Sequence, residues 1–257
     1  MNRVIQFLSL IKTFRFGAFP ILFSIIVRKP VKVKVGAHWF LQNLDESTVY
    51  HLLNSYSKLE KLVAALPVNT KGILIDGGAN NGLFSFLFSQ RFPEIKGYAF
   101  EPSPVLLPFL QKNLLNGSVK IRTEALAEKD GELTFYFSRN ADQIGSLHRE
   151  NVEEFEKKAD RVDSYQVNTK SLDSFIAEED VQRIGIIKLD VQGAELSILK
   201  GASRALEITD LLLIEVMLVE PTAFELLDFV RKRFPHYKVI NSVSYGADIL
   251  FSKEPIT

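Results

Sequence analysis

The chain has 257 residues, contains no cysteine, and carries 31 basic and 31 acidic side chains. Its length fits one α/β domain with an appendage, and it is long enough to bury a substantial core. A sequence without cysteine excludes disulfide scaffolds, iron–sulfur clusters, thiolate zinc sites and cysteine nucleophiles. An apolar content of 46% argues against disorder, and the zero net charge argues against a dedicated nucleic-acid binder.

The balanced total hides an uneven distribution of charge. Residues 1–44 contain seven basic residues and no acidic one, which leaves 24 basic and 31 acidic residues, a net charge of −7, in the remaining 213. The basic, apolar front of the chain therefore differs from the body behind it. We divide the sequence into an N-terminal extension, residues 1–70, and a main domain, residues 71–257.

The extension begins with an apolar run, residues 4–27, that Lys12 and Arg15 interrupt. Its longest uncharged stretch, Phe16–Val27, is shorter than the roughly 20 residues that span a bilayer, and no small-residue cleavage site of a secretory signal follows it. Three interpretations remain: a helical segment packed on the domain, an interfacial membrane anchor, or a cap on the substrate side. We expect a cytoplasmic protein, with peripheral membrane contact through residues 1–30 as the alternative.

The rest of the extension shows two regular patterns. Val31–Val35 alternates strictly and predicts a strand, with His38–Leu41 as its hairpin partner across Gly36. Asp45–Leu66 has helical spacing, and Asp45 or Ser47 is a suitable cap.

In the main domain, short apolar runs alternate with helical segments. The expected strands are Gly72–Asp76, Lys96–Glu101, Val119–Leu126, Ile184–Val191, Asp210–Met217, Lys238–Ser244 and Asp248–Ser252. The expected helices are Gly82–Phe92, Pro104–Asn116, Glu195–Leu206 and Thr222–Phe234. This alternation predicts a parallel sheet covered on both faces, closed by an antiparallel hairpin at Gly246. Gly131–Ser138 predicts an added antiparallel hairpin, and the charged residues 148–163 predict a solvated insertion or lid.

The first chemical signal is the loop Asp76–Gly82, which follows a strand and precedes a helix. Its small residues let the backbone approach a ligand, and the helix beyond offers free N–H groups to a polar or anionic group. Asn80 stands where a dinucleotide loop has a glycine, so the loop alone is also compatible with an ordinary tight turn.

The second signal is Glu101, which ends the next strand 25 residues after Asp76. A carboxylate at this place can accept both hydroxyls of a ribose and disfavours a 2′-phosphate. A surface turn before Pro102 is the alternative.

The third signal is the pair Lys188 and Asp190, which share one face of an otherwise apolar strand. Buried charges are costly without partners, so both residues are site candidates at the carboxyl edge of the sheet. A structural pair of a lysine and a carboxylate is the alternative.

Five motifs occur together in one order: IDGGANNG, AFEPSP, EALAEKDGELTFYFS, KSLDSF and KLDVQGAELSILKGA. Over roughly residues 71–252 the chain resembles the FkbM-type S-adenosylmethionine-dependent methyltransferases. The resemblance implies a Rossmann-like α/β fold with a seven-stranded, mostly parallel sheet and an antiparallel C-terminal strand. It also implies S-adenosylmethionine as the cofactor and O-methylation of a hydroxyl on a small molecule, sugar or glycan.

The resemblance also assigns roles. Residues of the glycine-rich loop would hold the methionine part of the cofactor: Asp76, Gly77, Gly78, Ala79, Asn80 and Gly82. Asp76 would meet the amino group, directly or through water. The adenosine part would lie against Glu101 at the ribose, Pro102 and Ser103 beside it, and Ala125 and Leu126 at the adenine.

Two residues depart from the family pattern. Gly77 stands where a β-branched residue is usual, and Gln192 stands where a glutamate is common. Gln192 cannot act as a base, which questions a general-base role at that position.

Transfer to a hydroxyl needs a group that takes its proton. Asp190 is the first candidate, and His148 is the second if its segment folds over the site, although it is also typical of an exposed loop. Lys188 would orient Asp190 or stabilise an oxyanion. A metal on Asp190 lacks convincing further ligands in the sequence, so we expect none.

Two other functions share parts of this pattern. A nicotinamide-dependent oxidoreductase is disfavoured by Asn80, by the terminal hairpin, and because no tyrosine has a lysine four residues later. A non-catalytic binding module is disfavoured by the intact loop together with Glu101. Methylation of RNA or DNA is disfavoured by the acidic body and by the lack of an Asn-Pro-Pro-Tyr-type motif.

Overall fold

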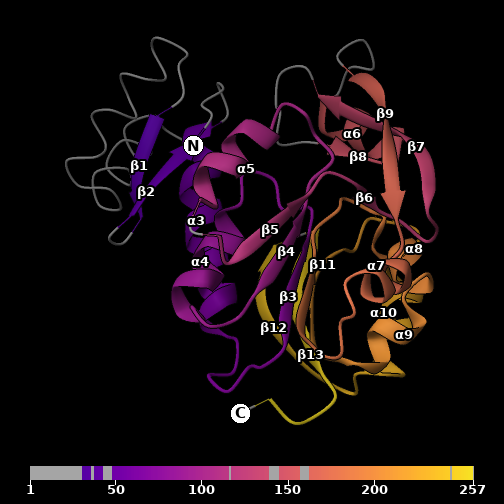
Figure 1. Ribbon diagram of the computed structural model, residues 1–257. Coiled ribbons are helices and arrows are strands. Elements are labelled where there is room, and N and C mark those ends of the chain that lie inside the picture. Colours follow the sequence, from indigo (N-terminus) through magenta and orange to yellow (C-terminus); the bar gives the residue numbers. More distant parts are fainter. Residues whose placement is uncertain are drawn as a thin grey trace.

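The computed structural model describes residues 31–35, 38–42, 48–115, 117–138, 145–156, 162–243 and 245–256 (Figure 1). The three interpretations of residues 1–30 fall outside these ranges.

The centre of the molecule is a seven-stranded sheet in the order β12-β13-β11-β10-β3-β4-β5. Its strands are β3 (Ile73–Gly77), β4 (Gly97–Phe100), β5 (Val119–Arg122), β10 (Ile184–Leu189), β11 (Thr209–Met217), β12 (His236–Val243) and β13 (Gly246–Ser252). β13 is antiparallel to β11 and β12, and the pairs from β11 to β5 are parallel. The predicted mostly parallel sheet with an antiparallel C-terminal strand is confirmed.

Helices cover both faces of this sheet (Figure 1). One face carries α3 (Thr48–Ala64), α4 (Leu83–Arg91) and α5 (Leu107–Asn113), and the other carries α7 (Leu172–Glu178), α8 (Glu195–Lys200), α9 (Ser203–Glu207) and α10 (Ala223–Arg231). Successive strand residues enter opposite cores: Ile186 packs with Phe84 and Phe88, and Ile187 packs with Phe175. Burial on both faces explains the unbroken apolar runs of the central strands.

The expected elements of the extension are present. β1 (Val31–Val35) and β2 (His38–Gln42) form an antiparallel hairpin that places Val35 opposite His38. The helix expected over Asp45–Leu66 is α3, whose Leu62 is buried in the same core as Phe84. α3 therefore packs directly on the main sheet.

A second sheet of four strands, in the order β6-β9-β7-β8, stands beside the first. It consists of β6 (Ala125–Leu126), β7 (Gly131–Ser138), β8 (Gly145–Ser146) and β9 (Val162–Lys170). β7 pairs antiparallel with β8 and β9, as predicted for the added hairpin. The predicted third strand, Val119–Leu126, is wrong as one element, because the chain leaves the first sheet after Arg122 and enters the second at Ala125.

The charged residues 148–163 were expected to form a solvated insertion or a lid. Their described part contains α6 (Arg149–Glu156), whose Val152 is only 1% exposed, so one side of this helix is buried. The helix expected over Glu195–Leu206 is split into α8 and α9. At the split, a side chain on Gly201 would lie 2.1 Å from the carbonyl oxygen of Glu128, so the turn is fixed by close backbone contact.

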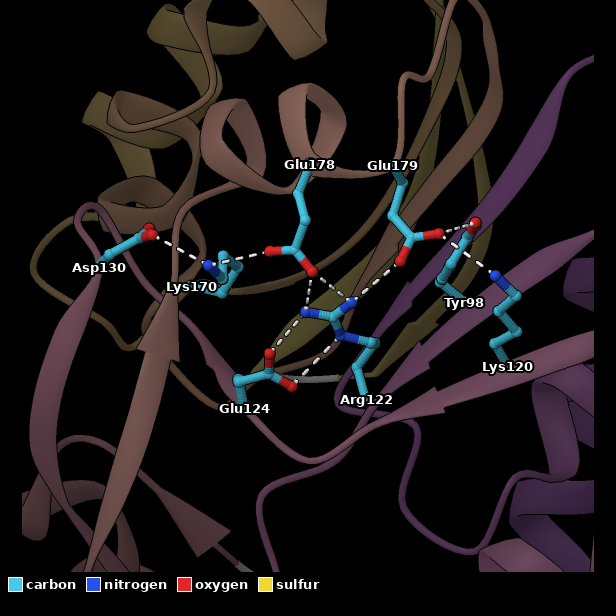
Figure 2. Close-up of polar contacts among 8 residues, drawn as sticks. All are labelled: Tyr98, Lys120, Arg122, Glu124, Asp130, Lys170, Glu178 and Glu179. Atoms are coloured by element: carbon cyan, nitrogen blue, oxygen red, sulfur yellow. Dashed lines mark hydrogen bonds and ion pairs between the residues drawn. The ribbon is translucent and has the colours of Figure 1, made fainter.

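A network of charged side chains spans the junction of the two sheets (Figure 2). Arg122, the last residue of β5, contacts Glu124 at 2.7 Å and Glu178 of α7 at 2.9 Å. Lys170 of β9 contacts the same Glu178 at 3.2 Å and Asp130 at 3.1 Å. The start of the second sheet is thereby tied to the end of the first through α7.

Candidate active site

A pocket opens beyond the carboxyl ends of three neighbouring strands. Gly78 directly follows β3, Glu101 follows β4 and Asp190 follows β10, and all three line it. β6, β7 and β8 of the second sheet supply further walls. The complete lining is Gly78, Asn80, Phe100, Glu101, Pro102, Ser103, Leu106, Ala125, Leu126, Phe135, Gly145, Leu147, Asp190, Val191, Gln192 and Ala194. Eight predicted site residues therefore meet in one place: Gly78, Asn80, Glu101, Pro102, Ser103, Ala125, Leu126 and Asp190.

Glu101 is the buried acidic group of this pocket, with an exposed fraction of 5%. Its two carboxylate oxygens accept hydrogen bonds from the backbone N–H groups of Asn80, at 2.8 Å, and Ser103, at 2.9 Å. Burial raises the pKa of Glu101 to about 7, although both N–H groups favour the charged form. Each oxygen keeps a free lone pair, so the carboxylate is held rigidly and can still accept two ligand hydroxyls.

The glycine-rich loop is shaped by contacts that exclude side chains. Gly78 has a φ of 72°, and a Cβ on it would lie 2.0 Å from the carbonyl oxygen of Asp190. A Cβ on Gly77 would lie 2.8 Å from Leu189 Cδ2 and 2.9 Å from Leu126 Cδ1. These two leucines fill the space of the β-branched residue that is usual in the family, which accounts for the departure at Gly77.

Four members of the predicted loop set do not line the pocket. Asp76 is described below, and the other three are Gly77, Ala79, which is buried, and Gly82, which has a φ of 86° and precedes α4. They determine the course of the backbone, so their direct contact with a cofactor stays a prediction.

Asp76 and Lys188 form a buried ion pair behind the loop. Asp76 is 0% exposed, accepts a hydrogen bond from Ser85 Oγ at 2.6 Å, and lies 3.1 Å from Lys188 Nζ. Lys188 Nζ also donates to the carbonyl oxygens of Gly78, at 2.8 Å, and Gly77, at 3.3 Å. Burial lowers the pKa of Lys188, but the charges of Asp76 and Asp190 outweigh it and raise the value. Lys188 thus holds the backbone of the loop through its hydrogen bonds to Gly77 and Gly78. The contact of Asp76 with the amino group of the cofactor stays a prediction.

The loop after β10 is organised by Glu195, which was predicted only as the first residue of a helix. Its carboxylate accepts the N–H groups of Val191 and Gly193, both at 3.0 Å. This allows Gln192 to adopt a φ of 56°. The Gln192 carbonyl in turn accepts hydrogen bonds from Asn151 Nδ2, at 2.6 Å, and from Ser146 Oγ. Burial raises the pKa of Glu195 to about 7.

Six charged side chains from four adjacent strands and from α3 lie next to one another beside this loop. We call them the charged row: Asp76, Lys188, Asp190, Glu215, Lys58 and Asp248. Lys188 lies 3.9 Å from Asp190. Gln192 Nε2 donates to Asp190 Oδ1 and to Glu215 Oε2, both at 3.0 Å. Lys58 of α3 lies 2.6 Å from Glu215 and 3.1 Å from Asp248.

Glu215, Asp248 and Lys58 are not among the site residues predicted from the sequence. Glu215 had a recognisable signal, because an acid near the end of an apolar strand, LLLIEVM, resembles the pattern that singled out Asp190. The amide of Gln192 also explains the other departure from the family pattern. A glutamate here would place a third carboxylate between two others, whereas Gln192 donates to both.

The two central carboxyls of the row have opposite pKa shifts. Burial acts to raise the pKa of Asp190, but the charges of Lys188 and Lys58 outweigh it and lower the value. Repulsion by Asp190, reinforced by burial, raises the pKa of Glu215. The two carboxyls therefore titrate as a pair, and the protonated form is favoured at Glu215 and disfavoured at Asp190.

His148 lies elsewhere. It lines a second cavity together with Glu128, Asn151, Lys200 and Glu220, and not the pocket that contains Glu101 and Asp190. Its side chain is 44% exposed, and its backbone N–H donates to Ser146 Oγ at 3.0 Å. A role for His148 as the base stays a prediction.

The described residues contain no cluster of three acidic or histidine side chains arranged to hold a metal ion. In the same part of the chain, no helix has the length and apolar character needed to cross a membrane.

The strand order, the antiparallel β13 and the pocket at the carboxyl edge define the class I methyltransferase fold. The sequence profile of the methyltransferase FkbM domain matches residues 76–238. The chain belongs to the FkbM methyltransferase family, and its cofactor is S-adenosylmethionine. Glu101, with a free lone pair on each oxygen, and the apolar walls Ala125, Leu126 and Leu147 fit the ribose and adenine of this cofactor.

Three characterised proteins illustrate the similarity. Methyltransferase sdnD of Sordaria araneosa is 32% identical over 167 residues, which cover 54% of this chain and 62% of sdnD. The hexuronic acid methyltransferase AglP of Haloferax volcanii is 27% identical over 146 residues, covering 56% of this chain and 55% of AglP. The 31-O-demethyl-FK506 methyltransferase FkbM of Streptomyces tacrolimicus is 26% identical over 156 residues, covering 52% and 60%. The matched part thus spans less than two thirds of each of these relatives.

Proposed function

We propose that this protein transfers a methyl group from S-adenosylmethionine to a hydroxyl of a small molecule, a sugar or a glycan. The observation that carries the proposal is the convergence of the loop glycine Gly78, the ribose-type acid Glu101 and the acid Asp190 in one pocket. The names of two relatives support the acceptor class, since one methylates a hexuronic acid and the other acts on 31-O-demethyl-FK506.

Each group of pocket residues has its own role in this proposal. Glu101 accepts the two ribose hydroxyls, while Ala125 and Leu126 contact the adenine. The backbone around Gly78 and Asn80 holds the methionine part, and Asp190 lies toward the reacting centre. When bound, the cofactor supplies an electrophilic methyl carbon on a positively charged sulfur. The protein aligns an acceptor oxygen with that carbon and excludes competing water.

The test measures the binding of S-adenosylmethionine, S-adenosylhomocysteine and NAD by calorimetry, and the melting temperature of the protein with each ligand. Saturation at 100 times the dissociation constant stabilises a protein by about 2.7 kcal/mol. For a chain of this size the melting temperature should rise by roughly 2–4 °C per kcal/mol. We expect this rise with both adenosyl ligands and none with NAD. A rise with NAD alone would support an oxidoreductase instead, and no rise with any ligand would support a non-catalytic module.

Glu101→Ala should weaken the binding of S-adenosylhomocysteine roughly 10- to 100-fold. Hydrogen bonds to a charged group contribute about 1.5–3 kcal/mol, and each 1.4 kcal/mol is a factor of ten. Glu225→Ala is the matched control, because Glu225 is an exposed residue of α10 that pairs with Lys200. Equal affinities of the two variants would contradict the role of Glu101.

The basic extension supports a second proposal, peripheral contact of residues 1–30 with an anionic membrane surface. Seven basic and no acidic residues among residues 1–44 favour attraction to lipid phosphates. Such contact would suit an acceptor that is linked to lipid.

A further inference from the structure

The charged row contains more negative than positive groups. It holds four carboxyls, Asp76, Asp190, Glu215 and Asp248, and two ammonium groups, Lys58 and Lys188. Their side chains are all at most 26% exposed, so water compensates little of the imbalance. Among the residues that the structure describes, the fully ionised row has an excess of two negative charges.

The imbalance is concentrated between Asp190 and Glu215. Lys188 lies 3.1 Å from Asp76 and 3.9 Å from Asp190. Lys58 lies 2.6 Å from Glu215 and 3.1 Å from Asp248, and its charge also acts on Asp190. Between Asp190 and Glu215 lies a neutral group, the amide of Gln192, which donates one bond to each. Two neighbouring carboxyls without a cation between them favour holding one proton. The raised pKa of Glu215 agrees with this arrangement.

Asp190 brings this pair to the pocket. It lines the same pocket as Gly78 and Glu101, whereas Glu215 lies one strand further along the carboxyl edge. A cation bound next to Asp190 would therefore supply the missing positive charge. S-adenosylmethionine has a sulfonium at its reacting centre, and S-adenosylhomocysteine has a neutral thioether.

We propose that the Asp190–Glu215 pair is the proton acceptor of the methyl transfer, and that it loses its own proton when the sulfonium of S-adenosylmethionine binds beside it. This rests on the proposed function. In the transfer, the pair takes the hydroxyl proton while the acceptor oxygen bonds to the methyl carbon. The carbon–sulfur bond breaks and its electron pair stays on sulfur. The positive charge beside the pair disappears in the same step, so the proton affinity of the pair rises as the proton arrives.

The groups that face Glu215 define which charges control this titration. In the described part of the chain they are Lys58 from α3, Asp190 and Gln192 from the loop after β10, and Asp248 from β13. Lys188 acts on Asp190 from the other side. Of these groups, the ones next to the pocket are Asp190 and Gln192, which is why a ligand charge should be sensed through Asp190.

The experiment measures proton release on binding. Titration calorimetry of S-adenosylmethionine and S-adenosylhomocysteine at pH 7, in phosphate and in Tris, gives the number of protons exchanged from the difference in buffer ionisation heat. We expect S-adenosylmethionine to release more protons than S-adenosylhomocysteine, by up to about one. Glu215→Gln should reduce this difference toward the part that arises from the ligand's own amino group. Glu225→Gln, on the surface of α10, should retain the full difference.

The relative affinity for the two adenosyl ligands should depend on pH for the same reason. As the pH increases, the preference of the wild-type protein for S-adenosylmethionine over S-adenosylhomocysteine should rise by up to tenfold per pH unit while the pair is protonated in the free protein. It should level off once the pair is ionised in the free protein. Glu215→Gln should lose the Glu215-dependent part of that slope. An equal proton difference and an equal slope in the wild type and in Glu215→Gln would overturn the inference.

Two outcomes separate the inference from the proposed function. If neither adenosyl ligand binds the wild-type protein, the proposed function fails. If both bind without the Glu215-dependent difference, the inference alone fails. If Glu215→Gln does not bind S-adenosylhomocysteine at all, the inference is tested by titrating the carboxyl groups of wild-type protein labelled with 13C-glutamate. The pH midpoint of one glutamate carboxyl should be lower in the presence of saturating S-adenosylmethionine than in the presence of saturating S-adenosylhomocysteine. Identical midpoints with the two ligands would contradict the inference.

Discussion

Gly78 is the residue at which two loops of the site touch. Its φ of 72° and the position of the Asp190 carbonyl, 2.0 Å from an added Cβ, leave no room for a side chain. Gly117 provides a matched comparison, because it has a φ of 75° but nothing within 4 Å of an added Cβ. The difference between the two positions is therefore steric contact and not backbone conformation.

Gly78→Ala should lower the free energy of unfolding by more than Gly117→Ala and should abolish measurable binding of S-adenosylhomocysteine. Strain of one residue costs about 1–3 kcal/mol, and the clash at Gly78 adds to it. Urea unfolding and calorimetry measure the two effects. Equal stability and equal binding in the two variants would show that the loops can separate without consequence.

Because Asp76 and Lys188 form a buried ion pair, we expect substitutions of the two residues to have non-additive effects on the free energy of unfolding. Lys188→Met leaves Asp76 charged and buried, which should cost about 3–5 kcal/mol of stability. Adding Asp76→Asn removes that charge, so the double variant should be more stable than the sum of the single changes predicts. Urea unfolding of the wild type and the three variants tests this coupling, and strictly additive changes would argue against the pair.

Among the elements, β5 and β6 show how the adenine wall is positioned. The chain leaves the main sheet after Arg122 and enters the second sheet at Ala125, so a break of two residues places Ala125 and Leu126 in the pocket. The Arg122 guanidinium contacts Glu124, Glu178 and Glu179 and so stabilises this break (Figure 2). It also lies 5.8 Å from the ring centroid of Phe175.

Arg122→Met, which keeps most of the aliphatic stem, should lower the free energy of unfolding by about 1 kcal/mol, a value reduced by solvent screening. Burial acts to raise the pKa of Glu124, but the Arg122 guanidinium outweighs it and lowers the value below the ordinary 4.5. Arg122 also lowers the pKa of Glu178, whereas the pKa of Glu179 is lowered chiefly by a hydrogen bond from Tyr98. Lowered carboxyl pKa values add stability above pH 4.5, and this stability is lost as the pH falls further. The difference between the wild type and Arg122→Met should therefore be constant above about pH 5 and shrink below pH 4. A difference that grows toward low pH would contradict this role.

At the scale of the whole molecule, the uneven charge predicts a salt-dependent membrane interaction. The full chain should sediment with vesicles that contain phosphatidylserine and not with neutral phosphatidylcholine vesicles, and added salt should weaken the binding. Replacing Lys12, Arg15, Arg28 and Lys29 with glutamine should reduce sedimentation while thermal stabilisation by S-adenosylhomocysteine is retained. Unchanged sedimentation of this variant would contradict the proposed contact.

Local sequence patterns predicted where the main strands end, and with them part of the candidate site. Gly78, Glu101 and Asp190 each directly follow a buried strand, and local patterns reveal such positions because the end of an apolar run is visible in the sequence. In parallel strands these ends lie at one edge, so the three residues could be expected to meet. The antiparallel β13 was likewise predictable, because no helix separates it from β12.

The rest of the site depends on contacts between residues that are far apart in the sequence. Lys58 and Glu215 are 157 positions apart, and their contact depends on how α3 packs over the sheet, which no local pattern encodes. The break between β5 and β6 has the same origin: VKIRTEAL reads as one strand, but Ala125 and Leu126 find their partners in Thr169 and Lys170 of β9. Local sequence specifies where a strand ends, whereas long-range packing specifies which charges and which strands become neighbours.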